Sequence, residues 1–453
     1  MKYFVNLQFE TPNEVKAMNV SHLLSAMVVA MATWMPAAAY DFMFNGLAYT
    51  VNADQATVSV SCTNRLSPDN YSQLDYAEIP DHVTTRQGIT YRVTAIDDFA
   101  FAGCGTLECV SIPATVERVG DRALAYCPML SIIEVDKDNA VYDSRVSCNA
   151  VIRVADNTLI AGCTVTMVPG TVRAIGPYAF AGCTELSRVS LPSSVTEIGY
   201  EAFGDCTSLT SIEIPATVDE VGCRAFAGCT QLRTLTVDSG NVRYHSPDGC
   251  NAVVERATGT LVAGCQGTTL PPSVTAIGYE AFSGCAALFN MAIPETVTGI
   301  GHYAFCRADD LQAVDIPATV TAFGDRAFAG CINLETITAR LANPATAEYY
   351  NLSTFDDVDK QACTVYVPHG TVSLYQATQP WTPFFNIREI PRFQYGDVNA
   401  DGSVDVADIN ILLNIVLGFD DADNYDDRAY ILGNDFVDVS DVNALINLVI
   451  SNK

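Results

Sequence analysis

A short pattern that recurs every 23 residues constrains this chain more than any other feature. The pattern is Ala-Phe-x-Gly-Cys or a close variant, and it ends at Cys183, Cys206 and Cys229, at intervals of 23 residues. A proline and a glycine recur with the same period between these cysteines. A fixed period of this length indicates a repeat architecture. The 453 residues therefore do not have to share one compact core.

One unit of the pattern, residues 209–229, shows the role of each position. Leu209, Ile212 and Ile214 form the inward face of a short strand. Pro215 has no amide hydrogen to donate and therefore ends that strand. A second extended segment, a glycine turn and a short helical turn that carries Ala-Phe complete the unit. One unit cannot bury its apolar face, but stacked units can, so the sequence predicts a solenoid.

A longer period of 102 residues overlies the short one, because two inserts interrupt the series. The inserts span about residues 136–168 and 238–270, and each contains two apolar runs around a turn cluster, which is typical of a β-hairpin. Folding each hairpin about its middle places two cysteines opposite each other, and a secreted chain would oxidise them. The expected disulfides are Cys148–Cys163 and Cys250–Cys265, and the alternative is that all four remain buried thiols.

The cysteines that end the repeat pattern are spaced regularly enough to suggest a metal or redox array. Ala308 nevertheless replaces one of them without a compensating change, and no Cys-x-x-Cys or histidine partner accompanies the series. A free cysteine packs as a small apolar side chain. We therefore predict that these cysteines are core residues.

The ends of the chain depart from the repeat. An apolar run over residues 23–39 closes on three alanines and predicts a signal peptide over residues 1–39, with an uncleaved anchor as the alternative. Residues 40–92 alternate apolar with polar positions and predict an N-terminal β-cap. Residues 340–392 predict a C-terminal cap and linker. Such caps shield the outermost units of a solenoid.

The repeat pattern, with its Ile-Pro, Ile-Gly and Ala-Phe-x-Gly-Cys elements, resembles the BspA-type leucine-rich repeats of bacterial surface and secreted proteins. The resemblance covers about residues 93–339. It implies a curved leucine-rich-repeat solenoid, a role in adhesion or protein binding, and a location that is secreted or on the bacterial cell surface. It implies no fixed ligand.

An acidic loop near the end of the chain has the spacing of a calcium site. Residues 397–408 carry oxygen side chains at positions 1, 3, 5, 9 and 12, with Gly402 at position 6. Calcium takes six or more oxygen ligands, and glycine permits the sharp bend between them. The alternative is an ordinary acidic turn. The expected ligands are Asp397, Asn399, Asp401, Asp408, the carbonyl of Ser403, and Asp405 directly or through water.

A pattern typical of a helix follows this loop, and a similar segment recurs 33 residues later. Two such loop-helix units resemble a type I dockerin, in a module that spans residues 393–453. The resemblance implies calcium-dependent attachment to a cohesin-like or other cell-surface or secreted protein. Because the second loop has fewer oxygen ligands, we expect its ion to be weak or absent. Its candidate ligands are Asp435, Asp438 and Asp441, and the partner-recognition positions that the resemblance implies are Val406, Ala407, Val439 and Ser440.

Together these features predict a mixed α/β repeat, a leucine-rich-repeat solenoid with a β-cap, followed by a small all-α calcium-binding module. The 24 basic and 52 acidic residues leave a net charge of −28, which argues against nucleic-acid binding and against direct attachment to anionic membranes. The five histidines are scattered, and no zinc-protease, nucleophile-elbow or phosphate-loop motif occurs. We therefore predict no catalytic residues.

The outward positions of the first strand in each unit form the expected ligand face for a protein or a glycan, although any solvated strand face has a similar composition. The selected residues are Glu108, Glu134, Thr210, Glu213, Arg233, Phe289 and Asp315. The leading hypothesis is a non-catalytic binding or adhesion protein whose tail attaches it to a partner in a polysaccharide-degrading assembly. The alternatives are a structural spacer in which only the tail binds, and an unrecognised carbohydrate-active enzyme.

Overall fold

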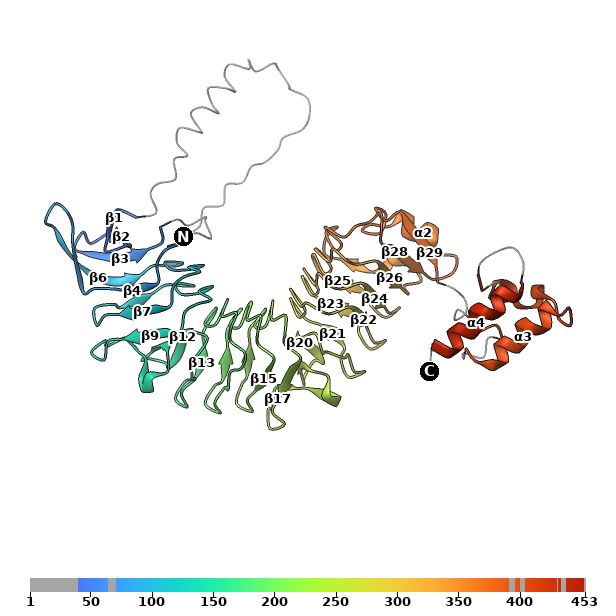
Figure 1. Cartoon of the computed structure of the whole chain (residues 1–453), viewed down its shortest axis with the longest axis horizontal. Helices are drawn as coiled ribbons and strands as arrows, with labels where there is room; N and C mark the ends of the chain where they lie inside the picture. Colours follow the sequence, from blue (N-terminus) through green and yellow to red (C-terminus); the bar gives the residue numbers. More distant parts are fainter. Residues whose placement is uncertain are drawn as a thin grey trace, which may run out of the picture. The chain divides into compact units, whose positions relative to one another are not determined.

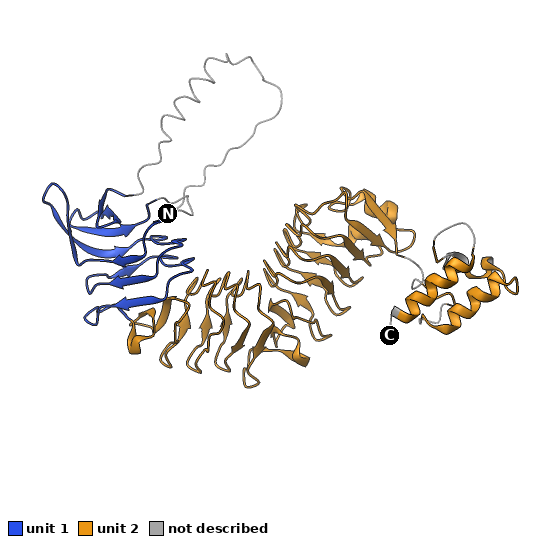
Figure 2. Ribbon diagram, viewed as in Figure 1, with its two compact units in different colours: residues 1–143 blue, residues 144–453 orange. Residues whose placement is uncertain are grey.

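The structure is a computed structural model that describes residues 40–63, 71–390, 396–399, 404–429, 431–432 and 437–451. The expected signal peptide, residues 1–39, lies outside the described residues. The chain forms two compact units, Met1–Asp143 and Ser144–Lys453 (Figure 2). The boundary between them falls inside the first predicted insert.

The first unit contains two sheets (Figure 1). The larger one has the strand order β1-β2-β3-β6-β5, with β8 paired to β6, and the smaller one is the parallel sheet β4-β7-β9. The buried Tyr71 hydroxyl accepts a hydrogen bond from the Ala48 amide (2.8 Å) and donates one to the Ser61 carbonyl (2.5 Å), which fastens the loop that carries it to the larger sheet. The strands are β1 Phe42–Phe44, β2 Leu47–Val51, β3 Thr57–Ser61, β4 Tyr76–Glu78, β5 His82–Thr84, β6 Thr90–Ile96, β7 Cys109–Ile112, β8 Arg118–Val119, β9 Ile132–Val135 and β10 Tyr142–Asp143.

In the second unit, the two short strands of each repeat join two different parallel ladders. First strands form the sheets β15-β17 and β22-β24-β26-β28-β29, and second strands form the ladders β13-β14-β16 and β21-β23-β25-β27. Ile212 and Ile214 of β15 are buried while Glu213 is exposed, because successive side chains of a strand point to opposite faces. Glu213 pairs with Thr236 of the next repeat, 23 residues later.

The elements of the repeats run from β11 to β27 along the second unit (Figure 1). They are η1 Arg145–Ser147, β11 Ala150–Arg153, β12 Thr158–Gly162, β13 Ala174–Ile175, β14 Glu197–Ile198, β15 Ser211–Ile214, β16 Glu220–Val221, β17 Thr234–Val237, β18 Tyr244–His245, η2 Pro247–Gly249, β19 Ala252–Glu255, β20 Thr260–Gly264, β21 Ala276–Ile277, β22 Asn290–Ala292, β23 Gly299–Ile300, β24 Ala313–Ile316, β25 Ala322–Phe323, β26 Thr336–Ala339, η3 Pro344–Thr346 and β27 Glu348–Tyr349.

Stacked phenylalanines fill the core of the second unit. The phenylalanine of one repeat stacks on that of the next, with ring centroids 5.0 to 5.7 Å apart. Cys206, Cys229 and Cys331 each donate to the carbonyl of the phenylalanine in the preceding repeat, as from Cys206 Sγ to Phe180 O at 3.2 Å. Six of the seven pattern cysteines are buried and Cys285 is partly buried, and burial raises the pKa of the Cys331 thiol to about 12. The seven are Cys104, Cys127, Cys183, Cys206, Cys229, Cys285 and Cys331. The prediction that these cysteines are core residues is confirmed.

The structure corrects the helical part of the predicted mixed α/β repeat. Ala225 and Phe226 were expected on a short helical turn, but they lie in hydrogen-bonded turns without a helix. Arg224, just before them, has a φ of 56°, and Glu201 and Glu280 at the equivalent positions have φ values of 51° and 53°. A left-handed residue interrupts a right-handed helical run. The repeats are therefore dominated by strands.

Both inserts contain antiparallel hairpins, β11-β12 and β19-β20, but the predicted disulfides are not formed. All sixteen cysteines are free thiols. Cys163 Sγ donates to the Asn149 carbonyl (3.4 Å), and Cys265 Sγ makes the same contact with the Asn251 carbonyl (3.4 Å). The expected pairing of Cys163 with Cys148, and of Cys265 with Cys250, is therefore corrected.

A β-bulge in each hairpin explains why these thiols do not meet. In the second hairpin, Val254 pairs with Leu261, and this register, continued outward, would bring Cys250 opposite Cys265. The bulge shifts the remaining pairs by one residue. A shift of one residue turns a side chain to the other face of the hairpin. Cys250 accordingly packs in one hydrophobic cluster and Cys265 in another.

The end of the repeat series is closed by β28 (Thr364–Val367), α2 (Val372–Ala377) and β29 (Asn386–Glu389). Tyr375 and Trp381 are fully buried there. The Tyr375 hydroxyl lies 2.9 Å from the Leu341 carbonyl, and Trp381 Nε1 donates to the Tyr349 hydroxyl at 2.7 Å. These large side chains cover the apolar surface that a further repeat would otherwise bury.

The C-terminal module contains the helices α3 (Val406–Val416) and α4 (Val439–Ser451), with the 3-10 helix η4 (Ala422–Ala429) between them. Leu412 of α3 packs with Val442 and Leu445 of α4 in a small core of its own. In the described part of the chain, no helix combines the length and the apolar character that crossing a membrane requires.

Candidate functional site

The predicted ligand face lies on the solvent side of the first strands. Of its seven residues, six are exposed and Asp315 is partly exposed. Glu108 and Glu134 lie at β7 and β9 of the first unit, Thr210, Glu213 and Arg233 at β15 and β17 of the second unit, and Phe289 and Asp315 at β22 and β24.

The structure corrects the expectation that the outward positions of all the first strands form one ligand face. They belong to three separate sheets, because the segments that follow the hairpins, residues 163–169 and 265–271, contain no strand. In the repeat after the first hairpin, the first-strand segment makes only an isolated β-bridge, from Arg188 to Ser211 of β15. Each insert therefore interrupts the face, and β15-β17 is a short sheet of its own.

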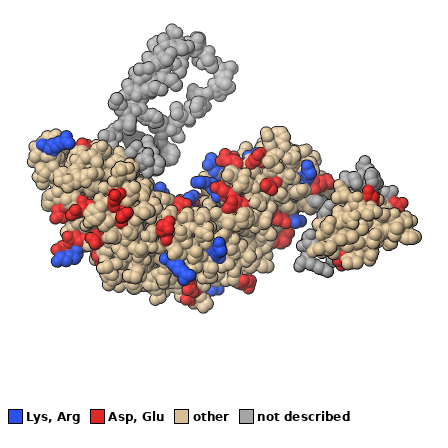
Figure 3. All heavy atoms as spheres, in the orientation of Figure 1, with Lys and Arg blue, Asp and Glu red and all other residues tan. Residues whose placement is uncertain are grey.

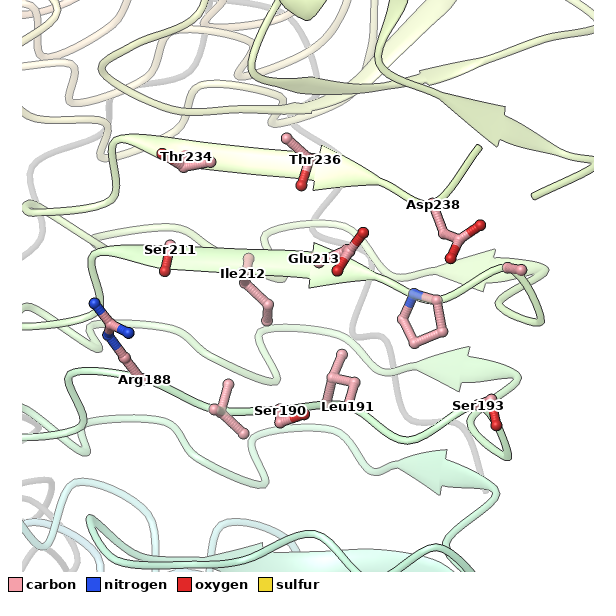
Figure 4. Close-up of a pocket in the computed structure, with 13 residues that line it drawn as sticks. Arg188, Ser190, Leu191, Ser193, Ser211, Ile212, Glu213, Thr234, Thr236 and Asp238 are labelled. Atoms are coloured by element: carbon pink, nitrogen blue, oxygen red, sulfur yellow. The ribbon is translucent and has the colours of Figure 1, made fainter. Parts of the chain in front are cut away.

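A groove of about 500 Å³ crosses this short sheet (Figure 4). The apolar residues Val189 and Leu191, both partly exposed, line it together with serines, threonines and three charged residues. Arg188 lies toward one end, Asp238 toward the other, and Glu213 between them (Figure 4). A concave site of this size that combines apolar and polar groups is typical of ligand-binding sites. Of the three charges, sequence reasoning selected only Glu213.

The charged groups of the groove have few partners within the protein. Among the described residues, the side chains of Arg188 and Glu213 take part in no hydrogen bond or ion pair. Asp238 accepts one hydrogen bond from the Gly240 amide at 2.8 Å. These groups are therefore free to contact a ligand.

Residues 250–351 repeat residues 148–249 with an offset of 102, and we call these segments the second copy and the first copy. In the second copy, Asp315 stands in the place of Glu213 and Arg340 in the place of Asp238. The Arg340 guanidinium binds both carboxylate oxygens of Asp315, at 2.7 and 2.8 Å. The negative charge of Asp315 is thus neutralised by Arg340 of the same chain. Sequence analysis missed Arg340, although the 102-residue offset contains the signal.

A second charged cluster joins the two copies away from the ligand face. Arg224 lies between Glu201 (3.3 Å) and Glu280 (3.5 Å), whose side chains are only 8% and 7% exposed. Burial raises the pKa of the Glu280 carboxyl, against the opposing effect of the Arg224 charge. Arg224 Nε and Glu280 Oε2 have no hydrogen-bond partner in the described structure. Because these groups hold two repeats together, we assign them a structural role.

The described part of the first predicted calcium loop is organised around Asp408, which is fully buried. Its Oδ1 accepts hydrogen bonds from the amides of Val398 (2.7 Å) and Asn399 (3.1 Å), and its Oδ2 accepts one from Asp405 (2.9 Å). Asp405 in turn caps α3 by accepting from the Ala407 amide. The predicted ligands Asp401 and Ser403 lie outside the described residues.

The second loop repeats this arrangement. Asp441 is fully buried, and its carboxylate accepts hydrogen bonds from the amides of Leu432 (2.8 Å) and Asp438 (3.0 Å). Asp435 lies outside the described residues. Within the described ranges, no group of three or more His, Cys, Asp or Glu side chains is placed to hold a metal ion.

The donor set of the first loop nevertheless fits calcium. Asp397 is 4% exposed and Asp408 is 0% exposed, and no ion pair between a basic side chain and Asp408 occurs among the described residues. A buried carboxylate requires a compensating charge. Three of the roughly four acceptor sites of the Asp408 carboxylate bind backbone amides, which leaves about one site for another ligand. Hard oxygen donors of this kind suit calcium.

The four predicted partner-recognition residues lie at the first turns of the two helices. Val406 and Ala407 begin α3, and Val439 and Ser440 begin α4. All four are exposed, and each valine is 60% exposed. All four positions are therefore accessible from solvent.

On the face that Figure 3 displays, acidic side chains lie among basic ones, and the basic side chains do not gather into one patch. The net charge of −28 would repel a phosphate backbone.

The profile of the BspA type leucine rich repeat region matches residues 71–150, 161–247 and 263–365, in six copies. No curated protein matches the chain. Among solved structures, a leucine rich cell surface protein from Faecalibacterium prausnitzii A2-165 is 22% identical, covers 79% of this chain and 96% of its own, and has a TM-score of 0.43. A leucine-rich repeat protein from Bacteroides ovatus ATCC 8483 is 21% identical, covers 78% and 77%, and has a TM-score of 0.33. The pneumococcal vaccine antigen PcpA is 17% identical, covers 78% and 99%, and has a TM-score of 0.43.

The profile match ends before the C-terminal module and covers more than half of the chain. The matched ranges contain the strands of the ligand face and most of the two 102-residue copies. The chain belongs to the family of proteins with the BspA type leucine rich repeat region.

Proposed function

We propose that this protein is a secreted or cell-surface binding protein of bacteria, without catalysis of its own. Its strand face takes a protein or glycan ligand, and its C-terminal module attaches it to a partner. The observation that carries the proposal is the groove on β15-β17, where Arg188 and Glu213 have no partners among the described residues. Membership in the BspA-type family supports a role in binding.

The proposed attachment depends on calcium. Asp397, Asn399, Asp401, Ser403, Asp405 and Asp408 would hold one ion, and Asp438 and Asp441 would contribute to a weaker second site. The ion would neutralise the buried carboxylates and thereby stabilise the loops that present Val406 and Val439. A cohesin-like protein is the proposed partner, in a polysaccharide-degrading assembly.

Calcium titration calorimetry on the full chain tests the attachment module. We expect one tight site in the wild type, its loss in Asp408→Asn, and no change in Asp420→Asn, which alters a partly exposed aspartate outside both loops. At a calcium concentration 100 times the Kd, binding stabilises the module by about 2.7 kcal/mol, so a chelator should lower its melting temperature. A melting curve that does not respond to the chelator contradicts a calcium-dependent module.

The ligand face is tested on protein and glycan arrays. The Glu213→Gln variant should lose signal, while Glu197→Gln, on β14 away from the face, should keep it. Equal signals for both variants would favour the alternative in which the repeats are a spacer and only the tail binds. Release of sugar from a glycan panel by purified protein would instead identify an enzyme and overturn the non-catalytic proposal.

A further inference from the structure

We propose that the groove of the first copy binds an extended segment of a partner protein that carries a basic and an acidic residue two positions apart. The basic side chain sits between Glu213 and Asp238, and the acidic one binds Arg188. This inference rests on the proposed binding function and names the chemistry of the ligand.

The second copy contains an internal stand-in for the basic side chain. Arg340, at the position of Asp238, places its guanidinium on Asp315, at the position of Glu213, through two hydrogen bonds of 2.7 and 2.8 Å. The same scaffold thus presents a carboxylate to a guanidinium at this point of the face. In the first copy the arginine is replaced by an aspartate, so two carboxylates stand where the second copy has a closed pair. A guanidinium or ammonium group from outside would restore the balance.

The spacing of the charges matches an extended peptide. Arg188 is in register with Ser211, and Glu213 lies two residues further along the same strand. Diagonal neighbours of this kind are about 7 to 8 Å apart. Alternate side chains of an extended chain, which point to the same side, are separated by about 7 Å. One ligand strand can therefore reach Arg188 and Glu213 with residues two positions apart.

The lining of the groove supports the same occupant. Its floor includes the partly exposed apolar residues Val189 and Leu191, and its rim carries hydroxyls such as those of Ser211 and Thr236. Apolar surface accepts the aliphatic stems of long side chains, and hydroxyls can bond to the ligand backbone. A neutral glycan would use the hydroxyls but would leave both signs of charge without partners, so the mixed charges favour a peptide.

The inference is tested by fluorescence anisotropy of labelled peptides on the full-length protein. The probes are Thr-Thr-Arg-Thr-Asp-Thr-Thr and a control with Gln and Asn in place of Arg and Asp. The charged peptide should bind at least tenfold more tightly, and this difference should shrink as salt is raised. Equal binding of the two peptides, or no binding of either, overturns the inference.

Two exchanges between the copies give the sharpest test. Asp238→Arg reproduces the arrangement of the second copy. The new arginine should pair with Glu213 and weaken binding of the charged peptide at least tenfold. Arg340→Asp opens the second copy and should add a second, weaker site for the basic group. Melting curves would verify that both variants fold, and Glu197→Gln serves as the matched control.

The outcome separates this inference from the broader function. If Asp238→Arg leaves charged-peptide binding unchanged, the groove is not the peptide site and the inference fails. If array ligands are glycans whose binding responds to Glu213→Gln but not to Asp238→Arg, the binding function stands while the peptide assignment falls. If the array shows no ligand and the peptide still responds to both exchanges, the inference stands and identifies the face's ligand class.

Discussion

The two copies of the 102-residue segment have similar interiors and different surfaces. Both contain a bulged hairpin in which a cysteine amide donates to a threonine hydroxyl, Cys163 to Thr166 at 2.7 Å and Cys265 to Thr268 at 2.8 Å. On the ligand face, however, the first copy has an open groove and the second a closed Asp315–Arg340 pair. Buried positions are restrained by close packing, whereas exposed ones are free to diverge. The comparison therefore points to the surface of the first copy as the functional one.

The largest expected effect tests whether the two interiors are equivalent. Phe203 and Phe305 occupy the same place in the two copies, are fully buried, and stack on a phenylalanine on each side. Phe203→Ala and Phe305→Ala should each reduce the free energy of unfolding by about 3 to 5 kcal/mol, measured by urea denaturation. A difference between them of more than about 1 kcal/mol would show that the copies do not pack alike.

The next effect distinguishes the copies. Arg224 separates two buried carboxylates, and its loss should cost about 2 kcal/mol, less than for a fully buried pair because its side chain is 31% exposed. Arg326, its counterpart, only approaches the exposed Asp356 at 3.9 Å. Arg326→Met should therefore change stability by less than about 0.5 kcal/mol. Equal losses for Arg224→Met and Arg326→Met would refute the assigned structural role of the cluster.

A smaller effect concerns pH. Burial raises the pKa of Glu280 above its usual 4.5, so the folded protein holds this proton at pH values where the unfolded chain has lost it. This stability is present below pH 4.5 and is lost as the pH rises through the raised pKa. Relative to Glu280→Gln, the wild type should therefore gain melting temperature on acidification from neutral pH toward pH 4.5. A constant difference between the two proteins across that range would contradict the raised pKa.

The smallest effect is on the face itself. Asp315→Asn breaks the charge-assisted pair with Arg340 and should cost about 0.5 to 1 kcal/mol, because both side chains are substantially exposed. Glu213→Gln, at the equivalent position, should leave stability unchanged since Glu213 has no partner among the described residues. Thermal unfolding at low and high salt measures both, and added salt should remove the Asp315→Asn effect. A loss in Glu213→Gln as large as in Asp315→Asn would mean that the groove is not open.

The repeat period by itself determined the fold class of most of the chain, because the residues that define each unit are close in sequence. Ile212, Ile214 and Phe226 have the burial that the pattern predicts, and Glu213 is exposed as expected. The same local reasoning selected Asp397, Asp408 and Asp441, all of which are buried. Their occupancy by calcium stays a prediction.

Tertiary structure alone decided the features that depend on contacts across the repeats. The bulge that turns Cys265 away from Cys250 could not be predicted by folding the hairpin sequence about its middle. The pairing of Arg224 with Glu280 spans 56 residues, and that of Arg340 with Asp315 spans 25, so neither follows the 23-residue period. The repeat period predicts which residues each repeat buries, because every repeat packs against its neighbours in the same way. Which charges on the surface find partners depends on the particular neighbours that stacking brings together.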